Sequence, residues 1–213
     1  MKFAMRKGMT LIEMLVVIGI IAVLVGASLT GFSKMTKTAE RARAQELVSN
    51  VATALTAYFQ QEGSWPGVIA RNGSTDGRLD AQVALVLARK QLLSLMTTGS
   101  GDGFKLDGVD QFGIVTPWAA TAIKRAGNAA SLGTAVGSAT VSDHVLHFAV
   151  DVDGDGIIKG ASVGGESVDI RATAAVWCIG KSGGNRGQPW PYSKGLRSDD
   201  VYSWTAGQTK NVK

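Results

Sequence analysis

The sequence predicts an α+β protein in which one long N-terminal helix is followed by a globular head with a small antiparallel sheet. Two observations lead to this class. Residues 14–62 favour helix without a break, apolar on all sides at first and then along one stripe. The runs that are typical of strands come late, after residue 143. A length of 213 residues allows one modest domain beside such a helix.

The first part of the helix, residues 9–33, is expected to cross a membrane or to form the core of a fibre. No residue from Met14 to Phe32 is charged, and an apolar run of this length can span a bilayer. Basic residues precede the run, so the positive-inside rule keeps the N-terminus in the cytoplasm and exports the rest. Glu13 stands at the head of this run, where a membrane penalises a carboxylate by roughly 2–3 kcal/mol.

A cut between Gly8 and Met9 would give Glu13 a partner. The new α-amino group would lie four residues before the carboxylate. An α-amine with a pKa of about 8 is mostly protonated at neutral pH. It would therefore neutralise Glu13 in its own chain or, in an assembly, in a neighbouring one.

This segment resembles the N-terminus of type IV prepilins and type II secretion pseudopilins, closely from Lys7 to Leu29 and more loosely in the helix that follows. The resemblance implies that residues 1–8 are a leader, which a prepilin peptidase removes after Gly8 before it methylates Met9. It places Glu13 at the fifth mature position, where the family has a glutamate. Thr30 departs from the family, because many pilins have proline there.

Two other interpretations of the N-terminus remain open. One is a secretory signal peptide that is cut before Ser28, and the other is a signal anchor that stays uncut. The position of Glu13 inside the apolar stretch argues against a signal peptide. So does the lack of a turn signal before the next helical segment.

Residues 34–62 are predicted to continue the helix with one apolar face, and residues 63–213 to form the head. The face consists of apolar residues at helical spacing: Leu47, Val48, Val51, Leu55, Tyr58 and Phe59. Gly63 is a stop signal, and Pro66 follows it. The basic group of residues 34–43 is interpreted as an anchor to anionic lipid headgroups, with DNA binding as the weaker alternative.

In the head, the sequence predicts two more helices and three strands. The helices are Leu79–Met96, capped by Asp80, and a short one from Thr116 and Pro117 to Arg125. The predicted strands are His144–Val152, Val168–Cys178 and Val201–Thr205. Residues 97–111 and 127–140 are predicted to be loops. The single cysteine, Cys178, excludes an intrachain disulfide and is expected to be a small buried apolar residue.

A second motif has the pattern of a calcium loop. Asp151, Asp153 and Asp155 alternate as at positions 1, 3 and 5 of such a loop, and Gly156 follows at position 6. Alternate carboxylates and the Ile157 carbonyl would converge on one hard cation that takes six to eight oxygens. Position 12 is Ser162 and not glutamate, so Ser162 or Glu166 would have to complete the site. The alternative is an acidic β-turn without metal.

A competing calcium position is Asp199 and Asp200, where the resemblance to major pseudopilins would place an acidic loop near the final strand. His144 and His147 are not expected to share a metal, because that spacing puts them on opposite faces of a strand. The sequence shows no set of nucleophile, base and orienting group, and no cofactor fingerprint. An enzyme is therefore not predicted, and calcium is the one cofactor considered.

The predicted function is a structural subunit that is processed after Gly8. It would assemble into a type II secretion pseudopilus, which serves protein secretion, or into a type IV pilus. The implied partners are the prepilin peptidase, other pilin or pseudopilin subunits, and an inner-membrane platform with its ATPase. The subunit would first span the inner membrane once, with its head in the periplasm. The alternative is a membrane-anchored or secreted calcium-binding module that does not polymerise. Three of the net +5 charges lie in the leader, so a nucleic-acid partner is not predicted.

Overall fold

A computed structural model covers the chain and describes residues 10–93, 112–137, 139–163, 166–180, 200–204 and 208–211. Within these ranges, the side chains of residues 27–34, 128, 166 and 209–211 lie outside the description. The chain divides into two compact units, Met1–Ala39 and Glu40–Lys213, and each is considered by itself.

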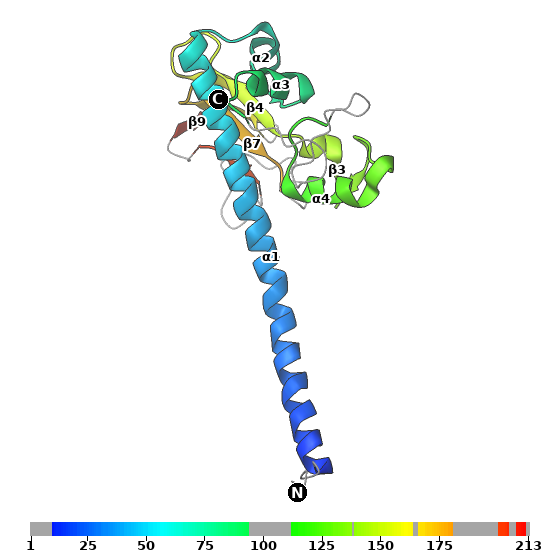
Figure 1. The fold of residues 1–213 in the computed structure, drawn as a ribbon. Coiled ribbons are helices and arrows are strands. Elements are labelled where there is room, and N and C mark those ends of the chain that lie inside the picture. The colour runs from blue at the N-terminus through cyan, green and yellow to red at the C-terminus, as the bar shows by residue number, and fades with distance from the viewer. Residues whose placement is uncertain are drawn as a thin grey trace, which may run out of the picture. The chain divides into compact units, whose positions relative to one another are not determined.

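Helix α1 runs from Leu11 to Glu62 (Figure 1), which confirms the predicted long helix. It also ends where the sequence indicates. Gly63 has a φ of 69° and donates its N–H to the carbonyl of Phe59 at 2.8 Å. Glycine reaches this left-handed conformation without steric cost, so it can close the last turn of the helix.

In the first unit, α1 exposes apolar side chains on all sides. The large apolar residues from Leu11 to Val25 are all exposed, between 40% for Val17 and 83% for Leu11. Among the described residues, no helix combines the length and apolar composition that crossing a membrane requires. The membrane-spanning role of residues 9–33 therefore stays a prediction.

In the second unit, one stripe of α1 lies in the core, as predicted. The stripe consists of Ala44, Val48, Val51, Leu55 and Tyr58, each less than one-tenth exposed. Leu47 and Phe59 are half-buried at its edge. The spacing of three and four residues repeats the helical period, so one side of α1 packs inward while the other meets solvent.

The described part of the chain contains three further α-helices, α2 (Gly67–Asn72), α3 (Ala81–Arg89) and α4 (Pro117–Ala126). Both predicted helix starts are confirmed. The side chain of Asp80 accepts the N–H of Val83 at 3.0 Å, and Thr116 accepts the N–H of Ala119 at 3.4 Å. Each bond satisfies a donor that the helix itself leaves without a partner.

Helix α3 is shorter than the predicted Leu79–Met96, because it closes with a Schellman motif. Gln91 adopts a φ of 57°, and its N–H donates to the carbonyl of Ala88 at 2.9 Å. The N–H of Leu92 reaches the carbonyl of Leu87 at 3.1 Å. Such a motif usually has glycine at the left-handed position, so a glutamine there does not indicate the end of a helix. The predicted loop 97–111 lies outside the described residues.

The main sheet has four antiparallel strands in the order β1 (Gly77–Arg78), β4 (His147–Val150), β7 (Ala174–Cys178) and β8 (Val201–Tyr202). A second antiparallel sheet contains β5 (Ile158–Val163), β6 (Glu166–Ile170) and β9 (Thr209–Asn211). The predicted antiparallel sheet is thus confirmed, and the second sheet was not predicted.

The main sheet is buried on both faces. In β7, Ala174, Val176 and Cys178 pack in one core with α1, α3 and α4. The alternate residues Ala175 and Trp177 pack in a second core with β5 and β6. Successive side chains of a strand point to opposite faces, so the sheet separates the helices from the second sheet. The predicted burial of Cys178 is confirmed, and Trp177 beside it is buried on the opposite face.

The prediction of one strand over Val168–Cys178 is wrong. Residues 171–173 leave the sheet register, and the N–H of Ala172 bonds back to the carbonyl of Ile170 at 3.0 Å. The chain there passes from the second sheet into the main sheet. The apolar alternation continues through this passage, so the periodicity could not reveal it.

Two smaller predictions also need correction. His144 does not belong to a strand with His147, because it lies in the 3-10 helix η2 (Val141–His144). There its Nδ1 accepts the indole N–H of Trp118 at 2.9 Å. The segment predicted as a loop, 127–140, contains the 3-10 helix η1 (Gly127–Ala129) and a hairpin of β2 (Ala135–Val136) with β3 (Ala139–Thr140).

Candidate functional site

The predicted assembly residue Glu13 lies in the first turn of α1 and binds Thr10. The backbone N–H of Thr10 donates to Glu13 Oε2 at 2.8 Å, and its hydroxyl donates to the same oxygen at 2.9 Å. The N–H of Glu13 points back to Thr10 Oγ1 at 3.4 Å. This is a capping box, in which the N-cap and third helical residue satisfy each other's donors.

The capping box gives the carboxylate a partner within its own first turn. The N-terminal end of a helix favours negative charge, because the free N–H groups of its first turn point out of that end. Sequence reasoning named only the α-amine of Met9 as a partner. Thr10 was missed, although a threonine three residues before a glutamate is the signature of this motif. Gly8 and Met9, the predicted processing residues, lie outside the described residues.

The acidic loop begins where β4 ends, and the fold holds its first residue from both sides. The N–H of Asp151 donates to the carbonyl of Thr173 at 2.9 Å. The carbonyl of Asp151 accepts the indole N–H of Trp65 at 2.5 Å, and Trp65 stacks on Phe59 of α1 with ring centroids 4.9 Å apart. Asp151 is 2% exposed, so it is fixed in the domain while the rest of the loop lies at the surface.

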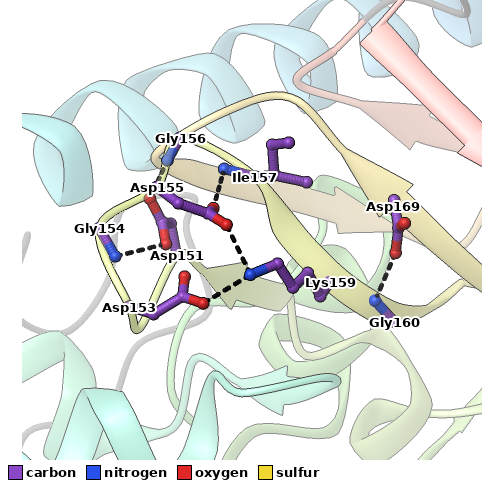
Figure 2. Close-up of polar contacts among 9 residues, drawn as sticks. All are labelled: Asp151, Asp153, Gly154, Asp155, Gly156, Ile157, Lys159, Gly160 and Asp169. Atoms are coloured by element: carbon purple, nitrogen blue, oxygen red, sulfur yellow. Dashed lines mark hydrogen bonds and ion pairs between the residues drawn. The ribbon is translucent and has the colours of Figure 1, made fainter.

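Backbone N–H groups surround the carboxylate of Asp151 (Figure 2). Gly154 donates to Oδ1 at 2.8 Å, and Gly156 donates to Oδ2 at 2.6 Å. Both glycines have positive φ, 77° and 82°, which side chains with a Cβ rarely adopt. Glycine at position 6 of the loop therefore suits the turn that the chain makes there. Asp155 accepts the N–H of Ile157 at 2.8 Å, so a second aspartate also orders the turn.

Lys159 binds the other two aspartates of the loop. Its ammonium group lies 2.6 Å from Asp153 Oδ2 and 2.5 Å from Asp155 Oδ2 (Figure 2). The hydrogen bond from Lys159 lowers the pKa of the Asp153 carboxyl. Asp153 and then Asp155 raise the pKa of Lys159. Asp153 and Lys159 therefore stay charged at neutral pH. Lys159 was not predicted as a site residue, because the calcium-loop pattern includes only residues that supply oxygen ligands.

Ligating atoms of Asp151, Asp153 and Asp155 lie within 4.8 Å of one another, so the structure brings the three predicted carboxylates together. The predicted twelfth position, Ser162, belongs to a strand. Ser162 lies in β5 opposite Ser167, and its N–H donates to the carbonyl of Thr75 at 2.9 Å. The side chain of Glu166, the other candidate, lies outside the described residues.

The competing position is only partly described. Asp200 is nearly buried, accepts the N–H of Gly180 at 2.7 Å and lies 3.3 Å from the hydroxyl of Tyr202. Among the described acidic residues it does not join the cluster around Asp151. Asp199 lies outside the described residues.

Comparison with known proteins identifies the N-terminal segment. Residues 4–29 match the family described as the prokaryotic N-terminal methylation motif. The matched range contains Gly8, Met9 and the Thr10–Glu13 capping box. The N-terminal segment of the chain thus carries this methylation motif.

The chain is also similar to curated proteins of Neisseria. It is 35% identical over 63 residues to a fimbrial protein of Neisseria meningitidis serogroup B, which covers 30% of this chain and 37% of the relative. It is 34% identical over 62 residues to the type IV major pilin protein PilE1 of Neisseria gonorrhoeae, covering 29% and 38%. The chain thus matches little more than a third of the length of these relatives. No solved structure matches it significantly.

The acidic loop lies outside residues 4–29, so the match to the methylation motif says nothing about the chemistry of the loop.

Proposed function

We propose that the chain is a structural subunit that is processed after Gly8 and polymerises through α1 into a fibre, with the Glu40–Lys213 unit as its head. One observation carries the proposal. A methylation motif with a glutamate in its first helical turn begins a helix whose apolar side chains are exposed on all sides.

The exposed apolar surface of α1 supports this assignment. Burying a large apolar side chain stabilises a protein by about 1.5–3 kcal/mol, so a dozen exposed ones strongly favour a cover. Lipid would provide the cover before assembly, and the helices of neighbouring subunits would provide it afterwards. The same surface therefore serves a membrane stage and a fibre stage.

The proposed sequence of events gives each N-terminal residue one role. Basic residues of the leader hold the N-terminus in the cytoplasm, and the head enters the periplasm. The prepilin peptidase cuts between Gly8 and Met9 and methylates the new amine. In the single subunit, Thr10 satisfies the Glu13 carboxylate. When the inner-membrane platform and its ATPase extract the subunit, Glu13 meets the Met9 amine of a neighbour, which sets the axial register.

Two kinds of fibre are compatible with this mechanism. The names of the curated relatives, fimbrial protein and type IV major pilin, favour a pilus. Thr30 in place of the proline of many pilins favours a pseudopilus that serves protein secretion. Deleting the gene in its natural host separates the two, because loss of surface fibres supports the pilus and loss of secreted proteins supports the pseudopilus.

The N-terminus of the exported protein tests the proposal against a module that does not polymerise. Sequencing and mass spectrometry should find a start at Met9 that carries one extra methyl group. Gly8→Val should block the cut. Gly19→Ala is the matched control, since a Cβ at Gly19 meets nothing within 4 Å. A start at Ser28, or an intact leader in wild-type protein, would contradict the proposal.

A further inference from the structure

The acidic loop must neutralise three carboxylates that converge at the surface of the head. Asp151, Asp153 and Asp155 bring ligating oxygens within 4.8 Å of one another. Like charges at this separation repel, and two carboxylates that share a site disfavour each other's ionised form. Each carboxylate nevertheless has a partner in the chain. Asp151 binds two backbone N–H groups, and Asp153 and Asp155 share the ammonium group of Lys159.

Lys159 is directed at the loop by a bulge in β5. The register between β5 and β6 shifts between Ile158 and Ala161. Within this shift Gly160 has a φ of 64°, and its N–H donates to Asp169 Oδ1 at 2.9 Å (Figure 2). A bulge changes the direction in which the adjacent side chain points. Asp169 and Gly160 thus anchor the strand on one side of Lys159, while the aspartates bind its ammonium group on the other.

The donor set does not fit calcium in this arrangement. Calcium takes six to eight oxygens. The Lys159 ammonium holds one oxygen each of Asp153 and Asp155, and both oxygens of Asp151 accept backbone N–H groups. Ser162, at the position where a calcium loop has a bidentate glutamate, offers a single hydroxyl oxygen. An ion would therefore have to displace the lysine.

We infer that Lys159 is a built-in cation that closes the acidic loop in the place that a metal ion takes in loops of the same pattern. The head is then folded around this loop at any calcium concentration. The inference is independent of fibre assembly, because it concerns the loop of a single subunit.

The test compares thermal unfolding of the full chain in detergent with chelator and with calcium. About 5 mM calcium is enough, because weak extracellular sites have dissociation constants of roughly 10⁻⁴–10⁻³ M. The variants are Lys159→Gln, which removes the charge, and Lys159→Arg, which keeps it. Lys124→Gln is the matched control, since Lys124 is exposed on α4. Calorimetric titration with calcium provides a second readout.

For wild type, Lys124→Gln and Lys159→Arg, the unfolding temperature of each protein should be the same in chelator as in calcium. None of the three should show calcium binding. Lys159→Gln should unfold roughly 2–4 °C lower in chelator, the shift expected for a small loss of stability in a chain of this size. Calcium should restore the unfolding temperature of this variant and should give a binding signal in the calorimetric titration. A calcium-dependent rise in the wild type would overturn the inference. So would a Lys159→Gln variant that matches wild type in both conditions, or one that calcium does not restore.

Discussion

Thr10 and Glu13 bind each other in the first turn of α1, with both donors of Thr10 on one carboxylate oxygen. The glutamate that would hold neighbouring subunits together thus already has partners in a single subunit. In the assembly that we propose, the carboxylate would exchange the N–H and O–H donors of Thr10 for the amine of a neighbouring subunit. It would then not have to lose its hydrogen bonds without replacement.

Removing the threonine hydroxyl should loosen the start of α1. In Thr10→Ala, the carboxylate loses one donor and the Glu13 N–H loses its acceptor. We expect faster hydrogen exchange at the amides of the first turn in detergent-solubilised protein. Thr10→Ser keeps the hydroxyl and should behave as wild type. Equal protection in Thr10→Ala and wild type would show that the capping box does not form.

The stripe of α1 in the second unit should contribute strongly to stability. Leu55 is fully buried, and replacing such a leucine with alanine typically costs about 2–5 kcal/mol. Each kcal/mol lowers the melting temperature of a chain of this size by about 2–4 °C. Leu132→Ala is the control, since Leu132 is 43% exposed and should change little. A small shift for Leu55→Ala would mean that α1 is not packed in the core of the head.

Replacing the left-handed residue at the end of α3 with glycine should stabilise the protein. Gln91 is the one described non-glycine residue with positive φ, a conformation that costs other residues about 1–2 kcal/mol. Glycine removes that cost, but it loses more conformational entropy on folding, which destabilises the protein by about 0.5–1 kcal/mol. Gln91→Gly should therefore raise the melting temperature slightly, whereas Gln91→Val should lower it. Stabilisation by valine would contradict the Schellman ending.

The sequence was informative wherever one local rule decides the structure. The helical period predicted the buried stripe of α1. One helix end and two helix starts were predicted correctly from Gly63, Asp80 and Thr116. Each of these residues makes a hydrogen bond with a backbone group that has no partner within the helix. The spacing of Asp151, Asp153 and Asp155 predicted that their carboxylates would converge.

Features that depend on tertiary contacts were missed. The alternation of Val168–Cys178 is the same whether the residues form one strand or two strands in different sheets. Gln91 carries no sign of a left-handed turn, because the Schellman bonds and the packing of Leu92 decide it. In the sequence, Lys159 cannot be distinguished from an ordinary surface lysine, because the bulge at Gly160 that directs it to the loop is visible only in the structure. Thr10 is different, since its motif was readable and was overlooked.

The most direct test of the account is whether Glu13 is needed for polymerisation and not for insertion. The chain is expressed with prepilin peptidase, platform and ATPase, and the sheared fibre fraction and the membrane fraction are both quantified. Glu13→Ala should reach the membrane at wild-type levels and be absent from fibres. Glu46→Ala, an exposed glutamate later in α1, should assemble normally. Normal fibres from Glu13→Ala would contradict the role of Glu13 in the assembly that we propose.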